Sequence, residues 1–588
     1  MKLPERVATV AEMVARLEDV THKGARFVDA AGRDEFFPYS AVARRARSAA
    51  GALQAAGVKP GDRVGVVLPT SIQFFDSFLG IQLAGGIPAA LYPPIRLGKL
   101  DEYFARIRRM LTKIGARFLI TDSRVRRLLG QAVDGVSSIE NVIDAGTLES
   151  GAPGKIAAVD PDSPAFLQFS SGSTVEPKAV MVSHTNLVEN LMMMLSSLGE
   201  YSEEDFLTGG VCWLPLYHDM GLLGCLYLGL FSPGTVTYIG PETFIARPAL
   251  WLKTISRYKA VISPAPHFAY GLCLKKVKDA EMQGVDLSSW RYALNGAEPI
   301  DVPTMEAFCD RFAQWGFRRE ALSPVYGLAE AGLGVSFSET GRAPLVTEFD
   351  RDALSRHKHA VPGKGRQLPS VGKPLPGLAL KIRDGKTDLP EGQVGRICVK
   401  GPSITKGYYG DPELTASMIH DGWLDTGDLG FLHDGELYIT GRAKDLIIIR
   451  GRNYAPHEVE ELLLNLDGLR TGCTVAAGTM VEGAGEELIV LAEKDLMSDR
   501  PTDEIVAEIQ SRILSGLSLS PYDVVILPPG TLPRTSSGKL RRSAALEQFL
   551  AGTLAPPEKV TTLKLLKEVG KSQLAWAKFA LRKNERGA

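Results

Sequence analysis

Short apolar segments alternate with helix-like segments through the first half of the chain, and this alternation most constrains the fold. Residues 63–68 form a β-rich run that is followed by the apolar, helix-like residues 74–84. Further short apolar runs lie at residues 117–120, 166–169, 260–263 and 292–295. A helix between two strands supplies the crossover connection that parallel strands need. The sequence therefore predicts an α/β fold with a largely parallel sheet.

The pattern changes in the second half of the chain, which at 588 residues is too long for a single core. Glycine and proline become denser, and short strands are expected at residues 395–400 and 436–440, as in a small β-rich subdomain. A new strand–helix pattern then begins, with a helix expected at about residues 457–466. We predict an N-terminal domain of residues 1–443 and a smaller α/β C-terminal domain of residues 444–588.

The composition narrows the possible functions. The formal net charge of −1 gives no support for a nucleic-acid partner. The six cysteines are scattered without a C-x-x-C pair, as expected of reduced, mostly buried thiols in a cytosolic protein. The N-terminus lacks a continuous apolar stretch, and no run reaches the roughly 18 to 20 apolar residues that a membrane span needs. We expect a cytoplasmic protein without stable membrane insertion.

A loop of small hydroxyl residues, SSGSTVEPK at residues 170–178, follows an apolar strand-like run. Gly172 can adopt a positive φ, and Lys178 adds a positive charge. The hydroxyl donors are Ser170, Ser171, Ser173 and Thr174. This combination suits the phosphates of a nucleotide, although its spacing is not that of the mononucleotide P-loop. Taken alone, a Ser/Gly loop is more often a flexible turn.

Six further motifs follow this loop in order. They are WLPLYHDMG (213–221), NGAEP (295–299), YGLAEA (326–331), DGWLDTGDLG (421–430), GRAKDLIIIRGRN (441–453) and TSSGK (535–539). The ordered set resembles the adenylate-forming superfamily of acyl-CoA synthetases, peptide-synthetase adenylation domains and luciferases, over about residues 5–545. The resemblance implies two α/β subdomains and a β-rich subdomain in the N-terminal domain, with a mobile C-terminal domain.

Within the superfamily the chain is most similar to the fatty acyl-AMP ligases. This likeness rests on three stretches of sequence: WLPLYHDMGLLG, SPAPHFAYGLC (263–273) and NGAEPI. An extra segment at about residues 338–370 supports it as well. The resemblance implies that this insertion restrains the small domain and disfavours reaction with CoA. A disordered polar loop is the alternative.

The resemblance also implies an ATP and Mg²⁺ site, since a carboxylate that attacks the α-phosphate brings two anions together. Ser173, Thr174 and Lys178 would hold the β- and γ-phosphates, and Glu330 would bind Mg²⁺. Tyr326 would pack on the adenine, and Asp428 would bind the ribose. The purine pocket and its surroundings would comprise Asn295, Gly296, Ala297, Glu298 and Gly327. Arg442 would assist at the ribose or phosphate, and Lys444 would mark the hinge.

The mobile catalytic lysine of the family corresponds to Lys539, which would reach the substrate carboxylate and the α-phosphate. His218 stands where the family places a residue beside the acyl carboxylate, although a buried structural histidine is an alternative. An exposed salt-bridge lysine is the alternative for Lys444. The loop departs from many relatives at Val175, Glu176 and Ala179, where an acidic side chain could weaken ATP binding.

The resemblance implies activation of a fatty acid to an acyl-adenylate with release of pyrophosphate. The acyl group would then pass to the phosphopantetheine thiol of an acyl carrier protein. A fatty acyl-CoA ligase and a non-catalytic acyl or nucleotide sensor are the alternatives. The basic amphipathic tail, residues 558–588, is expected to form a solvated helix on its own domain. A contact with a carrier protein or membrane surface is the other interpretation.

Overall fold

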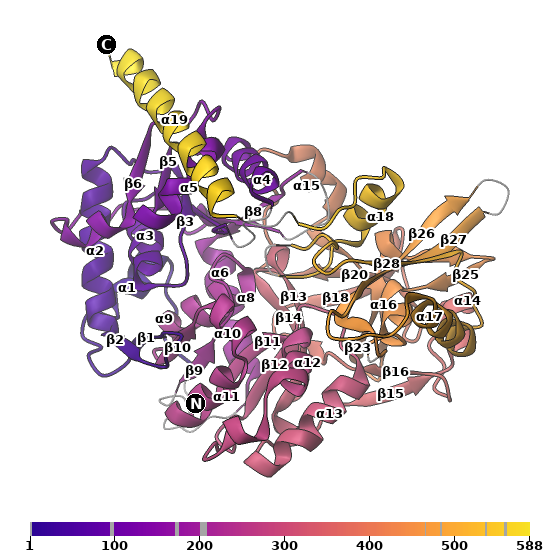
Figure 1. The fold of residues 1–588 in the computed structure, drawn as a ribbon. Coiled ribbons are helices and arrows are strands. Elements are labelled where there is room, and N and C mark those ends of the chain that lie inside the picture. Colours follow the sequence, from indigo (N-terminus) through magenta and orange to yellow (C-terminus); the bar gives the residue numbers. More distant parts are fainter. Residues whose placement is uncertain are drawn as a thin grey trace.

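The computed structural model describes residues 3–94, 99–170, 176–199, 209–464, 466–481, 485–535, 538–557 and 561–587. Two large sheets with helices around them form the N-terminal part of the molecule, and a β-rich unit and a smaller α/β unit follow (Figure 1). The mixed α/β class and this order of a large and a smaller part agree with the prediction.

The first sheet is mainly parallel. Its strands, in spatial order, are β6 (Asn141–Asp144), β5 (Phe118–Thr121), β3 (Arg63–Val67), β4 (Ile87–Leu91), β7 (Pro164–Phe169) and β8 (Ala179–Ser183). Only the β7–β8 pair is antiparallel. The central strands are almost continuously buried, as expected of apolar strands covered by helices on both faces. The predicted runs at 63–68, 117–120 and 166–169 are confirmed as strands.

The second sheet has a parallel centre and antiparallel edges. Its strands, in spatial order, are β17 (Lys373–Pro374), β14 (Leu333–Phe337), β13 (Leu322–Leu328), β12 (Tyr292–Gly296), β11 (Ile262–Pro266), β9 (Gly210–Cys212), β10 (Val236–Ile239), β1 (Gly24–Val28) and β2 (Asp34–Pro38). Parallel pairing runs from β1 to β13. Two of the predicted motifs, at 295–299 and 326–331, therefore lie at the same edge of the sheet.

The helices bury apolar faces against these sheets. The helices of the N-terminal part include α1 (Val10–Ala15), α2 (Tyr39–Ala55), α3 (Ile72–Leu83), α4 (Leu100–Lys113), α5 (Ser123–Val133), α6 (His184–Ser197), α8 (Asp219–Gly221), α9 (Leu228–Phe231), α10 (Pro241–Ala246), α11 (Ala249–Tyr258), α12 (His267–Lys276) and α13 (Val302–Phe312). The largest hydrophobic cluster includes side chains from both sheets, such as Val64 and Val211. The two halves of the N-terminal part therefore share one core.

The β-rich unit is antiparallel, as its alternating pattern predicts. It comprises β18 (Ala379–Asp384), β19 (Thr387–Asp388), β20 (Gly395–Lys400), α15 (Pro412–Met418), β21 (Ile419–His420), β22 (Trp423–His433) and β23 (Glu436–Arg442). The C-terminal unit comprises β24 (Ile447–Ile449), β25 (Arg452–Tyr454), α16 (Pro456–Glu461), β26 (Leu469–Val481), β27 (Gly485–Lys494), α17 (Thr502–Leu517), β28 (Asp523–Leu527) and α18 (Arg542–Leu550). This unit has its own hydrophobic clusters.

The inserted segment at about residues 338–370 is folded. It contains β15 (Val346–Phe349), α14 (Arg351–His357) and β16 (Arg366–Pro369), and β15 and β16 pair antiparallel. Phe349 and Leu354 pack in one buried cluster with Phe431 and Tyr438 of the β-rich unit. The alternative of a disordered polar loop is therefore excluded for this segment.

The tail forms a helix, α19 (Thr562–Gly587), but it does not lie on the C-terminal unit. It packs along α5 of the N-terminal part and projects beyond it (Figure 1, yellow). The expectation of a helix on its own domain is therefore wrong, because the buried face of α19 matches a surface nearly 450 residues earlier in the chain.

All six cysteines are buried and free, as the sequence predicts. Over the described residues, every helix is too short or too polar to cross a bilayer.

Candidate active site

The ends of the predicted phosphate loop lie beside Glu330. Ser171, Gly172, Ser173 and Thr174 fall outside the described residues. Ser170 follows β7, and its N–H donates to the carbonyl of Lys178 over 3.1 Å, which closes the loop. The Lys178 ammonium lies 5.8 Å from the ring centroid of Tyr408. The Tyr408 hydroxyl in turn donates to Glu330 Oε1 over 3.0 Å.

Glu330 is a plausible ligand for a hard cation by its chemistry. It lies on a 3₁₀ turn directly after β13. Burial raises the pKa of its carboxyl group, and the charge of Asp219 adds to this, whereas Tyr408 and Lys178 act in the opposite direction. A divalent cation would supply the missing positive charge. No cluster of three or more His, Cys, Asp or Glu side chains suited to a metal occurs in the described part of the chain.

Two predicted residues, Tyr326 and Arg442, contact a third, Asp428. The Tyr326 hydroxyl donates to Asp428 Oδ2 over 2.6 Å, and Arg442 Nε donates to Oδ1 over 3.0 Å. Asp428 and Arg442 are register partners on β22 and β23, while Tyr326 lies on β13. Burial and the Asp428 charge raise the pKa of the Tyr326 hydroxyl, which therefore stays protonated. These two hydrogen bonds fix the position of the Asp428 carboxylate.

The motif NGAEP turns sharply at the end of β12. A Cβ on Gly296 would lie 2.6 Å from the carbonyl oxygen of Val325, so only glycine fits there. Ala297 has a φ of +62°, which is uncommon for a residue with a side chain. The Glu298 carboxylate accepts a hydrogen bond of 3.0 Å from the N–H of Phe268. Similarly, a Cβ on Gly327 would lie 1.9 Å from the carbonyl oxygen of Leu333.

The predicted Asn295 lies beside two residues that the sequence did not single out, His267 and Asp301. Asn295 is fully buried, and its Nδ2 lies 3.1 Å from His267 Nδ1. His267 Nε2 lies 2.5 Å from a carboxylate oxygen of Asp301. Within the described residues Asn295 Oδ1 has no hydrogen-bond partner. The histidine lies in the quoted segment SPAPHFAYGLC, but nothing in the sequence links it to Asp301.

Lys539 reaches the centre of this constellation. Burial lowers the pKa of the Lys539 ammonium group, and the positive charge of Arg442 lowers it further. The negative charges of Glu298, Asp219 and Asp428 act in the opposite direction and raise this pKa. A tight loop presents the lysine: Thr535 N–H donates to the Lys539 carbonyl over 2.7 Å, and Lys539 N–H donates to Thr535 Oγ1 over 3.1 Å. The last motif of the chain is therefore brought to the edge of the N-terminal sheet.

His218 forms a pair with Asp219, which the sequence analysis did not single out. His218 Nδ1 lies 2.6 Å from Asp219 Oδ1. Burial by itself would raise the pKa of Asp219, but His218 and Lys539 outweigh it and hold that pKa at about 2. Asp219 is thus an ionised carboxylate facing the lysine. Its signal in the sequence was only its position next to the histidine.

Lys444 lies on a short turn between the β-rich and C-terminal units. Burial lowers the pKa of its ammonium group, and Asp445, Arg442, Lys178 and Asp428 also act on it. These charges place Lys444 near the other predicted nucleotide residues, and the residue as a whole is exposed, which agrees with the alternative of an exposed lysine.

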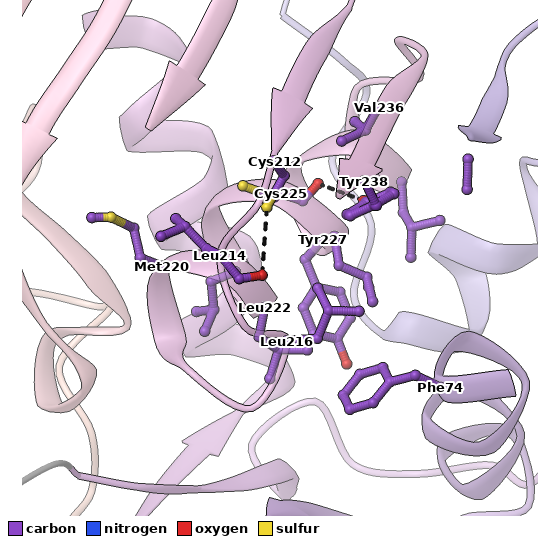
Figure 2. Close-up of a cluster of buried hydrophobic side chains, with 14 of the residues drawn as sticks. Phe74, Cys212, Leu214, Leu216, Met220, Leu222, Cys225, Tyr227, Val236 and Tyr238 are labelled. Carbon is purple, nitrogen blue, oxygen red and sulfur yellow. Dashed lines mark hydrogen bonds between the residues drawn. The ribbon is translucent and has the colours of Figure 1, made fainter. Parts of the chain in front are cut away.

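An apolar cavity lies along the helix that begins at Asp219. This helix continues through a π-helical segment (Leu222–Tyr227) into α9. The cavity is lined mostly by glycine and apolar side chains, among them Gly210, Gly224, Cys225, Leu228, Gly229 and Val236. Figure 2 shows Cys225 and Val236 in the surrounding hydrophobic cluster, where the Tyr238 hydroxyl donates to the Cys225 carbonyl over 3.4 Å. Such walls suit an alkyl chain.

Helix α16 of the C-terminal unit is held from two sides. Arg366 of the insertion is 7% exposed, pairs with Glu458 Oε1 over 3.0 Å and contacts His457 Nε2. Arg542, three residues after Lys539, pairs with Glu460 over 2.5 Å. Through this short helix the insertion is connected to the loop that carries Lys539.

The comparisons with known proteins show the family of the chain. The family model described as AMP-binding enzyme matches residues 18–409. A putative acyl-CoA synthetase of Caulobacter vibrioides is 35% identical over 531 residues, which cover 88% of this chain and 91% of the relative. JamA of Moorena producens, named a medium-chain-fatty-acid–[acyl-carrier-protein] ligase, is 35% identical over 542 residues, with 88% and 90% covered.

Solved structures give the same result. A structure from a study of fatty acyl-adenylate ligases of E. coli and L. pneumophila has a TM-score of 0.86 and 32% identity, and covers 94% of this chain and 98% of its own. A fatty acid AMP ligase of Legionella pneumophila has a TM-score of 0.70 and 33% identity, with 93% and 97% covered. The chain therefore belongs to the AMP-binding enzymes of the adenylate-forming superfamily, and the structures that it matches include those of fatty acyl-AMP ligases.

Proposed function

We propose that the protein activates a fatty acid with ATP and transfers the acyl group to the phosphopantetheine thiol of an acyl carrier protein. One observation carries the first step. Lys539 lies among Asp219, Glu298, Asp428 and Arg442, and the helix that begins at Asp219 lines an apolar cavity. A polar centre that can hold a nucleotide is thus joined by one helix to walls that suit an alkyl chain.

In the proposed first step a carboxylate oxygen of the fatty acid attacks the α-phosphorus of ATP. The bond between that phosphorus and the bridging oxygen to the β-phosphate breaks, and pyrophosphate leaves. Asp428 would bind the ribose hydroxyls, with its position fixed by Tyr326 and Arg442. Lys539 would lie against the carboxylate and the α-phosphate, where its positive charge offsets the charge of the transition state.

The phosphates would be held by Lys178 together with Ser173 and Thr174. Glu330 would hold Mg²⁺, which neutralises phosphate charge during the displacement when it is bound. The residues of the chain align the groups: Lys178 and Glu330 are linked through Tyr408. His218 would lie beside the acyl carboxylate, and Lys444 would mark the hinge of the C-terminal unit.

The choice of acceptor rests on the insertion and on the relatives. The insertion makes three contacts with the C-terminal unit. Arg366 pairs with Glu458, and Arg351 donates to the carbonyl of Gly516. Asp352 pairs with Arg452. These contacts favour the arrangement with Lys539 in the site, so a second arrangement that admits free CoA is costlier. A carrier protein could offset that cost through its own contacts. The printed name of JamA supports this acceptor for the relative.

A fatty acyl-CoA ligase is the second candidate, because the Caulobacter relative is named a putative acyl-CoA synthetase. A non-catalytic sensor is the third candidate, but a binder needs no lysine among the nucleotide residues.

One assay separates the three. The purified protein is incubated with ATP, Mg²⁺ and labelled fatty acid, together with CoA, a phosphopantetheinylated carrier protein or neither. We expect acyl-AMP and pyrophosphate in all three samples and acyl transfer only to the carrier. Efficient acyl-CoA synthesis would support the second candidate. Binding without pyrophosphate release would support a sensor.

A further inference from the structure

The C-terminal helix α19 is anchored on the N-terminal part through specific contacts with α5. The N–H of Gly130 donates to Ser572 Oγ over 2.9 Å, and Gln131 Nε2 donates to Glu568 Oε2 over 2.8 Å. The indole N–H of Trp576 donates to the carbonyl of Arg126 over 3.0 Å. Ser572 and Glu568 are buried by this contact.

The two helices approach most closely at Gly130. A Cβ at this position would lie 2.2 Å from the backbone carbonyl oxygen of Ser572. No side chain can occupy that distance, so the docking of α19 requires glycine at this point of α5. Arg582 and Asp134 form a further ion pair over 2.5 Å near the outer end of the interface.

The connection between the C-terminal unit and α19 is short. Leu554 still packs in a core cluster of the C-terminal unit, and Pro557 still contacts it, since a Cβ at Gly530 would lie 3.3 Å from Pro557 Cγ. Helix α19 begins at Thr562. Five residues of extended chain span at most about 18 Å, which is therefore the largest possible separation of Pro557 from Thr562.

We propose that α19 is a strap that ties the C-terminal unit to the N-terminal part at a second point, besides the chain crossing near Lys444. Because the linker is short, Pro557 can move away from Thr562 only as far as about 18 Å of extended chain allows. A larger swing that removes Lys539 from the site would thus require α19 to leave α5. The inference rests on the proposed function only in that it takes such a swing to accompany acyl transfer.

The anchoring is of a kind that can be released without unfolding a domain. Polar contacts make up much of the interface, and Trp576 and Phe579 are only half-buried. The outer leucines Leu566, Leu574 and Leu581 remain more than 60% exposed. Helix α19 is therefore held by one face only.

Two variants test the strap in different ways. Gly130→Ala places a Cβ against Ser572 and should detach α19, while alanine favours the helical conformation of α5 itself. Insertion of ten Gly/Ser residues after Pro557 leaves the docking surface intact but slackens the tether. Gly570→Ala is the matched control, because a Cβ there meets no atom within 4 Å.

Hydrogen exchange is measured on the full-length protein without ligand, with α19 reporting docking and α16 reporting the contact of the C-terminal unit with Arg366. We expect Gly130→Ala to speed exchange in both helices at least tenfold. The variant with ten Gly/Ser residues inserted after Pro557 should show faster exchange in α16, whereas α19 should stay protected. Exchange in Gly570→Ala should match that of the wild type. Unchanged α16 exchange in the slackened variant would overturn the strap.

Acyl transfer from preformed acyl-AMP to a carrier thiol is measured in parallel. We expect a several-fold increase in both test variants. If every form, including the wild type, fails to transfer the acyl group, the proposed function fails. The exchange of α16 still decides the strap in that case, because it needs neither acyl group nor thiol.

Discussion

At the scale of single residues, the site is governed by the balance of charge around Lys539. Asp219, Glu298 and Asp428 favour its charged form, and burial disfavours it. The ionised Asp219 is the closest link between this lysine and the helix that lines the apolar cavity. The site is thus prepared for a ligand that brings additional negative charge.

We expect Lys539→Ala to slow acyl-AMP formation by roughly 10²–10³-fold, because it removes one electrostatic contact to the transition state. ATP binding should survive, since the lysine acts mainly on charge that develops during reaction. Pyrophosphate release and nucleotide binding are measured separately. Lys386→Ala, at an exposed site, is the control. A rate within a few-fold of wild type would contradict the assignment.

The lowered pKa of Lys539 predicts a pH effect. Adenylation needs the charged lysine, so its rate should decline as pH rises. The midpoint of this decline should lie below the ordinary lysine pKa of about 10.4. In Lys539→Arg the alkaline decline should move to higher pH, because guanidinium stays protonated. Above the lowered pKa, the unfolded chain binds more protons at this lysine than the folded chain does. The free energy of unfolding contributed by this group should therefore rise as pH increases through the lowered pKa. An identical alkaline limb in both proteins would count against this interpretation.

We expect Glu330→Gln to raise the Mg²⁺ concentration needed for half-maximal adenylation and to slow the reaction. An amide oxygen carries no net charge to offset that of the metal. The measurement is a Mg²⁺ titration of pyrophosphate release at saturating ATP. Glu339→Gln, at an exposed position, is the control. Unchanged Mg²⁺ dependence would place the metal ligand elsewhere.

At the scale of elements, α16 connects the insertion to the catalytic loop. On one side of α16, Arg366 contacts His457 and forms an ion pair with Glu458. On the other side, Arg542 forms an ion pair with Glu460. Burial and the charges of Arg366 and Arg542 lower the pKa of His457, so it is neutral and can accept from Arg366. The insertion therefore supports the position of Lys539 through α16.

We expect Arg366→Ala to reduce acyl-AMP formation about tenfold with little change in the KM for ATP. Its loss leaves Glu458 without a buried partner only in the arrangement that places Lys539 in the site. In a Lys539→Ala background the same substitution should have no further effect. Arg342→Ala, at an exposed site of the insertion, is the control. An equal loss in the Lys539→Ala background would show that Arg366 acts on stability alone.

At the scale of the whole molecule, several connections hold the C-terminal unit, among them the chain crossing near Lys444, the insertion, α19 and the ion pair of Lys275 with Asp495. Each one involves a different surface of the N-terminal part. The arrangement with Lys539 in the site therefore does not depend on a single contact. Release of the unit requires the loss of at least the insertion contacts.

We expect replacement of residues 346–369 by a short glycine linker to permit some acyl-CoA synthesis. A penalty of about 2.7 kcal/mol corresponds to a hundredfold change in population, so even a modest loss of contact energy matters. Acyl-CoA and acyl-AMP are quantified after incubation with ATP, fatty acid and CoA. Thermal unfolding of the variant checks that the rest of the chain remains folded. No acyl-CoA from a folded variant would separate the insertion from acceptor choice.

The sequence by itself determined the alternation of strands and helices, the β-rich unit and the family. It also singled out Lys539, Asp428, Arg442 and Glu330, because such motifs are local and keep their order along the chain. The tertiary structure decided the partners: Asp219 beside Lys539, His267 beside Asp301, Arg366 on α16, and α19 on α5. These contacts join segments 34 to 450 residues apart, and their energy depends on burial and shape that no local pattern encodes.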